Sequence, residues 1–288
     1  MIEKNITTWE EFKNALTENI TEDTTYNIKN DLDATNDILT ENIFCAYDNF
    51  KKIFKGNDYK INGITAYGDV TVFSAYRGIV TEYNFRNYRF YNIKFTNFMI
   101  DSGTFTNLCH NSSGADYNDL FVNCFFNGVC KTFVPAINTN RVAYFTKCSF
   151  NIRCEMFSSD YSTFDSCYIN ITPLQNTNSF NNNATLINSY VEGVIKNTFS
   201  SSTFLSPRFI GNNVFNCKVI ITNYSASTTY KVYTSDKPVL VNKDKLLQSD
   251  GVTPIKNIAS ANNIYFLTDE QMKNKTYIQQ NTEFPLYG

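Results

Sequence analysis

A degenerate pattern of apolar and polar positions returns along the middle of the chain. Each copy opens with an apolar anchor, carries a small or polar residue two positions later, and places apolar residues three and five positions after the anchor. Successive anchors lie 29, 31, 24, 19, 22 and 23 residues apart. The anchors are Ile61 as an expected early copy, Phe90, Phe121, Phe145, Phe164, Leu186 and, as a weaker copy, Phe209. A repeat of constant phase and variable length indicates a solenoid, in which a three-strand coil takes about two dozen residues and loops absorb the longer spacings.

This repeat predicts an all-β protein, a single-stranded right-handed parallel β-helix over residues 21–222, with less regular coils before the first detectable copy. The composition agrees with that fold class, since Phe and Tyr together supply 44 residues and charged residues only 18% of the chain. Aromatic residues favour strands. We therefore expect one elongated β-domain between two different ends.

The N-terminal end, residues 1–20, predicts a short capping helix. Thr8 and Glu11 have the spacing of a capping box, and Trp9 and Phe12 begin an apolar face. Placed before the first coil, this helix would cover the open core and the strand edges, which otherwise invite aggregation.

The C-terminal end, residues 223–288, is expected to form a distinct segment because the motif fades after residue 222. Thr268 begins a sequence typical of a capped helix. This segment could cap the lower end of the stack or dock on a partner, and the sequence does not choose between the two.

Cysteines form two columns in the expected coils. The fourth motif position carries Ile93, Cys124, Cys148, Cys167 and Ser189, and a second column holds Cys130 and Cys154, each nine residues after its anchor. No pair of the eight cysteines has the Cys-x-x-Cys spacing of a zinc knuckle. We interpret them as buried free thiols that pack the interior, and we expect no metal site and no cofactor.

The seventh motif position holds Asn127, Asn151 and Asn170. Asparagine tolerates a left-handed bend and can bond to the amide of its neighbour along a stack of strands. We expect an internal asparagine ladder at this position, with a structural role.

The fifth motif position points outward and holds Phe125, Tyr168 and Tyr190, interrupted by Ser149. Exposed aromatic side chains in a row can stack on sugar rings or fill a protein interface. These three aromatic residues are our candidate binding site. The competing interpretation is a flank that packs under a loop or against a neighbouring subunit.

Catalytic chemistry finds little support in the motifs. Glycoside hydrolysis needs two carboxylates about 5 to 9 Å apart, and lyase chemistry needs a base, usually beside Ca²⁺-binding carboxylates. Asp165 is the acid that we place outward within a motif, whereas Asp116, Asp119 and Asp160 fall in expected loops. The Asn-Thr-Asp, Gly-His-Gly and Arg-Ile-Lys strings of polygalacturonase-type β-helices do not occur. We expect no catalytic residue.

The single histidine, His110, follows Cys109 in an expected loop. Adjacent side chains on an extended segment point in opposite directions, so the two would not readily meet as a nucleophile and its base. We interpret His110 as an exposed loop residue.

Charge and hydropathy exclude two classes of partner. The formal net charge is −2 with thinly spread Lys and Arg, which leaves no basic stripe for nucleic acid. No apolar run approaches the roughly 20 residues that span a bilayer, and the first residues lack the pattern of a secretory signal. We therefore expect no nucleic acid, no membrane insertion, and synthesis in the cytoplasm.

Three segments carry a resemblance to a known family: the opening residues 7–16, the coils of Phe-x-Asn-Cys-x-Phe-Asn type, and the closing residues 267–274. Together they resemble β-helical proteins of bacteriophage particles, such as tail spikes, tail fibres, baseplate appendages and capsid-decorating proteins. The resemblance implies a non-enzymatic structural or adhesive virion protein. Its implied partners are other virion proteins, further copies of itself in a homotrimer, and host surface glycans.

No catalytic residue carries over from that family. The chain also departs from typical spikes, because it shows no evident N-terminal particle-anchoring domain or long C-terminal trimerisation region, so a small decoration or appendage fits as well as a fibre. A polysaccharide depolymerase, either glycoside hydrolase or lyase, with acids in a groove between subunits is the alternative function. A bacterial surface adhesin ranks last, since it would need an export route.

Overall fold

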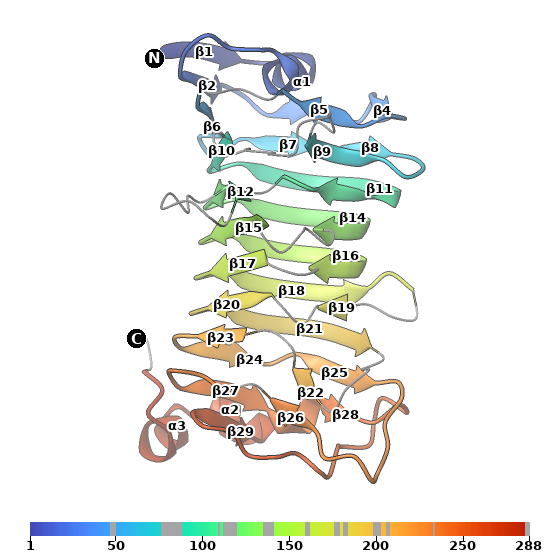
Figure 1. Ribbon diagram of the computed structural model, residues 1–288, viewed down its shortest axis with the longest axis vertical. Helices are drawn as coiled ribbons and strands as arrows, with labels where there is room; N and C mark the ends of the chain where they lie inside the picture. The colour runs from blue at the N-terminus through green and yellow to red at the C-terminus, as the bar shows by residue number, and fades with distance from the viewer. Residues whose placement is uncertain are drawn as a thin grey trace.

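The strands of the protein stack along one long axis in the computed structural model (Figure 1). The structure describes residues 1–46, 50–75, 88–108, 110–111, 120–134, 141–158, 162–175, 179–180, 184–197, 203–205, 208–232 and 234–285. Two long parallel sheets, here called sheet A and sheet B, run down this stack. The architecture is therefore all-β with long parallel sheets, which is compatible with the expected solenoid.

Sheet A contains the strands that carry the motif anchors. Its strands pair in parallel, in an order that follows the chain. They are β1 (Ile2–Ile6), β2 (Thr24–Ile28), β6 (Lys52–Lys55), β10 (Tyr88–Tyr91), β13 (Phe121–Val122), β15 (Arg141–Thr146), β17 (Ser162–Asp165), β20 (Thr185–Ile187) and β23 (Arg208–Ile210). The short β12 (His110–Asn111) pairs antiparallel with β15.

Sheet B contains the long strands that follow each anchor strand, and its upper and lower parts are built of shorter ones. The long strands are β11 (Lys94–Thr106), β14 (Phe125–Val134), β16 (Ser149–Ser158), β18 (Tyr168–Pro173) and β21 (Tyr190–Asn197). The upper part holds β3 (Leu32–Asp33), β4 (Ile38–Leu39), β5 (Ile43–Cys45), β7 (Lys60–Asn62), β8 (Thr65–Ala66) and β9 (Thr71–Ala75). The lower part holds β24 (Asn213–Phe215), β25 (Lys218–Ile221), β27 (Val239–Asn242), β28 (Leu246–Leu247) and β29 (Ile264–Leu267), while the short β19 (Ser179–Phe180) pairs with β16 in the middle of the stack. A separate parallel pair joins β22 (Thr203–Leu205) to β26 (Lys231–Val232).

The bend between the two sheets lies at the third motif position. Five non-glycine residues there have positive φ angles between 46° and 55°, and Gly211 has the same role in the next copy. They are Asn92, Asn123, Lys147, Ser166 and Asn188. Asn is among the residues that enter this left-handed region most readily. The seventh position, where Asn would tolerate such a bend, lies inside the strands of sheet B and has no positive φ angle in Asn127, Asn151 or Asn170.

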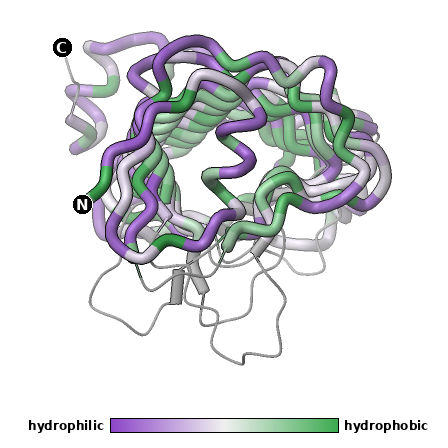
Figure 2. The backbone as a smooth tube through the Cα atoms, turned by 90° about the horizontal axis from the view of Figure 1, so that it is seen from above, coloured by the Kyte–Doolittle hydropathy of each residue, from purple (hydrophilic) through white to green (hydrophobic). Residues whose placement is uncertain are grey.

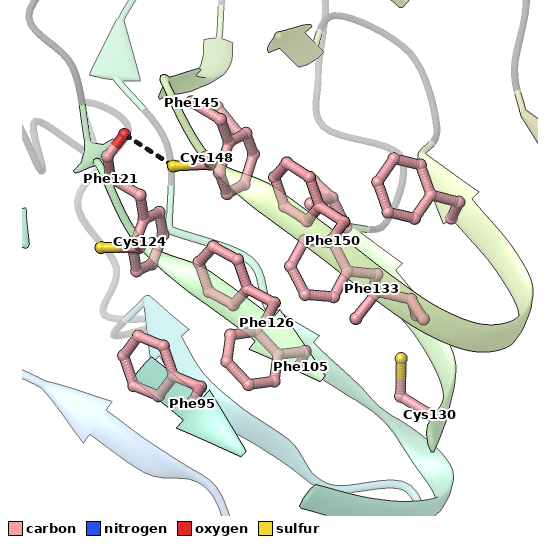
Figure 3. Close-up of a cluster of buried hydrophobic side chains, with 14 of the residues drawn as sticks. Phe95, Phe105, Phe121, Cys124, Phe126, Cys130, Phe133, Phe145, Cys148 and Phe150 are labelled. Atoms are coloured by element: carbon pink, nitrogen blue, oxygen red, sulfur yellow. Dashed lines mark hydrogen bonds between the residues drawn. The ribbon is translucent and has the colours of Figure 1, made fainter. Parts of the chain in front are cut away.

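The fourth motif position closes the same bend from inside. Cys148 donates from its thiol to the carbonyl oxygens of Phe121 and Thr146, both at 3.4 Å (Figure 3). Ser189 makes the equivalent pair of bonds through its hydroxyl, both at 2.9 Å. Cys124, Cys148 and Cys167 are buried and free, as are Cys130 and Cys154, which face each other on paired strands. The prediction of stacked, buried thiols is confirmed for these cysteines.

Columns of stacked phenylalanine rings fill the interior (Figure 3). The anchor column runs through Tyr26, Phe54, Phe90, Phe121, Phe145 and Phe164, with ring centroids 4.8 to 5.2 Å apart. A second column, at the sixth motif position, contains Phe95, Phe126 and Phe150, and a third contains Phe105, Phe133 and Phe157. Rings stack within a column, and the rings of the second column meet those of the other two edge to face, for example Phe126 with Phe121 at 5.4 Å and with Phe133 at 5.3 Å. Both are favoured aromatic geometries.

The register places one expected copy differently. Phe90 pairs with Phe54, and Ile61 pairs with Phe95. Ile61 therefore occupies the sixth motif position and not the first, so its assignment as an anchor is wrong. The true earlier anchors, Phe54 and Tyr26, were missed because a 36-residue spacing separates Phe54 from Phe90.

The N-terminal helix α1 (Trp9–Thr17) covers the upper end of the core (Figures 1 and 2). The capping box between Thr8 and Glu11 is present, and Phe12 is fully buried against Phe54. The predicted helix is confirmed, but its place before the first coil is wrong, since β1 precedes it and pairs with β2.

A buried cation closes the C-terminal end of α1. Lys52 is fully buried, and its ammonium donates to the carbonyl oxygens of Ala15, Leu16 and Glu18. Tyr88 donates its hydroxyl to the Leu16 carbonyl at 2.8 Å. Carbonyl groups at a helix C-terminus lack partners within the helix and attract positive charge, so these two side chains fix α1 on the stack.

The C-terminal part continues the stack before it turns helical. Strands β27 and β29 extend sheet B in parallel below β24. The short η1 (Lys243–Lys245) comes directly after β27, and helices α2 (Asp269–Lys273) and α3 (Lys275–Asn281) follow β29. Thr268 forms a capping box with Gln271, which confirms the helix start predicted there. The domain boundary after residue 222 stays a prediction.

Candidate functional site

Three columns of side chains lie on the outer face of sheet B. Alternate residues of a strand share a face, so the fifth, seventh and ninth motif positions all point away from the core. The fifth-position column runs through Lys94, Phe125, Ser149, Tyr168, Tyr190, Val214, Leu240 and Tyr265. The amide column, at the seventh position, contains Thr96, Asn127, Asn151, Asn170 and Glu192. The ninth-position column contains Met99, Val129, Arg153 and Thr172.

The candidate aromatic residues all belong to the fifth-position column. Tyr168 is 41% exposed, and its ring stacks on that of Tyr190 with centroids 5.8 Å apart and planes 12° from parallel. Phe125 is half-buried two strands away, on the other side of Ser149. The structure therefore places the three residues in one line, and their role in binding stays a prediction.

Glu192 connects the stacked tyrosines to the amide column. Tyr168 donates its hydroxyl to the Glu192 carboxylate, and this hydrogen bond raises the pKa of Tyr168 to about 12. Asn216 donates to the Tyr190 hydroxyl at 2.8 Å, while burial raises the pKa of Tyr190. Glu192 was not among the residues singled out from the sequence. Its position was a usable signal, since it is an acid at the seventh motif position, where three other copies carry Asn.

The amide column is a hydrogen-bonded ladder. Asn151 donates to Asn127 at 2.7 Å, and Asn170 donates to Asn151 at 3.3 Å. A similar bond of 2.8 Å joins Asn242 to Asn216 below Glu192. The expected ladder is confirmed, but the expectation that it is internal is wrong, because these side chains lie on the outer face with Asn151 exposed.

A shallow groove of about 440 Å³ lies between the amide and ninth-position columns. Its lining includes Asn97, Met99, Asn151 and Arg153, and Met99 is 53% exposed. Asn97 has a φ of 54° at a register shift in β11, which identifies a β-bulge that turns its side chain toward the groove. The groove therefore presents amides, an apolar side chain and a guanidinium.

Gly128 shapes the floor of this groove. A Cβ atom there would lie 2.5 Å from both a ring carbon and the carbonyl oxygen of Phe98. Phe98 is buried, so neither group has free space to move into. Only glycine permits this close approach of β14 and β11.

The lower part of the fifth-position column is covered. Leu240 packs in a small apolar cluster with Ile278 of α3 and with Phe284, and Val214 and Tyr265 pack against this cluster. Figure 2 shows the C-terminal end of the chain outside the ring of strands, and Figure 1 shows α2 and α3 at the level of β27 and β29. The chain therefore covers its own outer face at these lower positions, whereas the competing interpretation of Phe125, Tyr168 and Tyr190, a flank under a loop or against a neighbouring subunit, stays a prediction.

Of the other candidate groups, the structure describes Asp165 and His110, and it places both apart from this face. Asp165 is half-buried in sheet A and accepts a 2.9 Å hydrogen bond from Ser166 at the bend. His110 lies in β12, while Cys109, Asp116, Asp119 and Asp160 lie outside the described residues. Within the described part of the chain, no group of three or more His, Cys, Asp or Glu side chains is placed to hold a metal ion.

In comparisons with known proteins, no family model, curated protein or solved structure matches this chain. Among the residues that the structure describes, no helix is long and apolar enough to cross a membrane. The features that bear on function are therefore the outer face of sheet B and the motifs that carry the resemblance.

Proposed function

We propose that this protein is a non-enzymatic structural or adhesive component of a bacteriophage particle, and that it contacts host surface glycans through the outer face of sheet B. The proposal includes the finer architecture, a right-handed parallel β-helix. It also takes over the implied partners, which are other virion proteins and two further copies of the chain in a homotrimer. No cofactor takes part.

The observation that carries the proposal is the uncovered aromatic part of the fifth-position column. Tyr168 and Tyr190 stack on each other beside an amide ladder and a groove, and none of these side chains is needed to fill the core. Aromatic rings beside amides are a suitable surface for sugars, because rings stack on the apolar faces of pyranoses while amides bond to their hydroxyls. A rigid stack of strands also suits a particle appendage.

The test of location uses phage particles purified from cells that carry this gene. We expect the chain to co-purify with infectious particles in density gradients and to be detected by mass spectrometry in a fixed ratio to other particle proteins. Electron microscopy with a specific antibody would then place it on the head or the tail. If the chain is absent from particles, the virion assignment is wrong.

The alternative, a polysaccharide depolymerase, is favoured by one observation, the carboxylate of Glu192 beside two tyrosines. Hydrolysis requires a second carboxylate about 5 to 9 Å away. Continued upward by its strand pairing through Asn62, the amide column holds one further described acid, Asp33, six strands from Glu192 and therefore about 29 Å away. The purified protein should therefore release neither reducing ends nor unsaturated sugars from host polysaccharides. Cleavage that disappears in Glu192→Gln would instead favour the depolymerase over the non-enzymatic virion protein.

A further inference from the structure

The fifth-position column contains a gap where the aromatic series is interrupted. Phe125 pairs with Ser149, and Ser149 pairs with Tyr168, so a small hydroxyl side chain lies between two rings. Strands in a sheet lie about 4.8 Å apart, so the Cα atoms of Phe125 and Tyr168 are separated by roughly 9.6 Å along the stack. Ser149 fills little of that space.

The interior of the same protein shows what such a space can hold. Phe126 lies between Phe95 and Phe150 in the sixth-position column, with centroid separations of 5.3 and 5.1 Å. These three rings belong to β11, β14 and β16, whereas Phe125, Ser149 and Tyr168 belong to β14, β16 and β18. One six-membered ring therefore fits between two rings that are two strands apart. We propose that the gap over Ser149 is a slot that binds one pyranose ring of a glycan, between Phe125 and Tyr168.

The neighbouring column supports a sugar as the occupant. Asn151 lies two residues after Ser149 on β16, so its amide is about 6.6 Å along the strand from the slot. An amide has two N–H donors and two acceptor lone pairs, and the ladder bonds of Asn151 use one donor and one lone pair. The remaining capacity suits the hydroxyls around a pyranose better than the edge of an aromatic side chain.

Tyr190 and Glu192 hold one wall of the slot in place. The Tyr168 ring stacks on Tyr190 on its lower side, and the Tyr168 hydroxyl is bonded to Glu192. The opposite, upper face of the Tyr168 ring is on the side of Ser149. A ring fixed before binding loses little conformational freedom when a ligand arrives, which favours affinity.

This inference rests on the proposed glycan binding and specifies its site. The decisive variant is Ser149→Tyr, which fills the slot with a side chain of the protein itself and completes the aromatic series from Phe125 to Tyr190. Thr163→Tyr is the matched control, since it adds the same side chain to the outer face of sheet A. Tyr168→Ala removes one wall of the slot.

The full-length protein and these three variants are measured on an array of neutral and acidic hexose oligosaccharides, followed by calorimetry with the best binder. We expect binding by the wild type and the Thr163→Tyr variant, and affinity lowered about tenfold or more by Ser149→Tyr and Tyr168→Ala. Thermal unfolding of Ser149→Tyr should occur no earlier than that of the wild type, so lost binding cannot be attributed to unfolding.

Three outcomes would overturn the slot. If Ser149→Tyr binds as well as the wild type, the ring lies elsewhere, and the adhesive function survives without this site. If no oligosaccharide binds, both the slot and the glycan contact fail, although the presence of the chain in particles remains a separate question. If N-acetyltyrosinamide binds the wild type but not Ser149→Tyr while sugars do not bind, the occupant is an aromatic side chain of a partner protein.

Discussion

The fifth-position column of sheet B has an uncovered upper part and a covered lower part. In the upper part, Tyr168 is 41% exposed and Tyr190 is half-buried. In the lower part, Leu240 is only 3% exposed, because α3 and Phe284 pack over it. Both parts have the same register on the same sheet. The difference teaches that the chain can cover this surface with its own C-terminal segment. The fold therefore does not by itself require Tyr168 and Tyr190 to stay uncovered.

The largest expected effect comes from the covered part. Leu240→Ala removes a buried side chain beneath α3, and such substitutions reduce the free energy of unfolding by about 2 to 5 kcal/mol. Tyr168→Ala, in the uncovered part, should reduce it by less than about 1 kcal/mol, since half-exposed side chains bury little area. Denaturant unfolding measures both. If both variants lose the same free energy of unfolding, the covered and uncovered parts of the column do not differ in their contribution to stability.

The next effect concerns the floor of the groove beside the uncovered part. Gly128→Ala forces a methyl group against the ring and carbonyl of Phe98, and overpacking of this kind costs about 1 to 3 kcal/mol. Gly68→Ala is an instructive control, because a Cβ at Gly68 meets no atom within 4 Å but must adopt a φ of 78°. A loss at Gly128 no larger than that at Gly68 would mean that backbone conformation, and not close packing, decides the cost.

The seventh-position column offers a smaller effect of opposite sign. Glu192 interrupts a series of amides, so Glu192→Asn should let the ladder continue from Asn170 toward Asn216. One added hydrogen bond contributes about 0.5 to 1.5 kcal/mol to stability. Glu192→Asn also removes the exposed hydrogen bond from the Tyr168 hydroxyl, which contributes little to stability. Thermal unfolding should therefore shift upward by no more than the ladder bond supplies, and Glu192→Gln, with a longer side chain, serves as the control. A destabilised Glu192→Asn would show that the carboxylate is itself part of the structural ladder.

The sequence predicted the parts of the fold that depend on periodic burial. The anchors from Phe90 to Phe209, the cysteine columns and both capping boxes follow from residue type and spacing, and the structure has them. The register of Ile61 could not be obtained in this way, because Ile, Phe and Tyr are equally suited to either apolar position of the motif. Spacing alone also gave no sign that β1 would precede α1.

The outer face was harder to predict for a physical reason. Alternation in a strand determines which residues point outward but not what covers them, so the phase of Tyr190 gave no information about its cover, and Leu240, after residue 222, was assigned to no motif position. The covering helices come from a segment about 30 residues further on, outside the repeat. The asparagine ladder was assigned to the interior because ladders of amides are often buried, whereas here the core is occupied by phenylalanine rings.

The smallest effect is a pH dependence confined to the uncovered part. The hydrogen bond to Glu192 raises the pKa of Tyr168 from 10.0 to about 12, so the folded state holds this proton more tightly than the unfolded chain. A raised pKa means that the stabilisation is fully present below pH 10 and is lost as the pH rises toward 12. The effect should be slight, because the pair is exposed to solvent. Absorbance of tyrosinate, compared between wild type and Tyr168→Phe, measures the titration directly. In Glu192→Gln the carboxylate is gone, so the Tyr168 titration should return toward 10.0, and a titration that stays high there would assign the shift to burial of Tyr168 and to the charge of the neighbouring Tyr190.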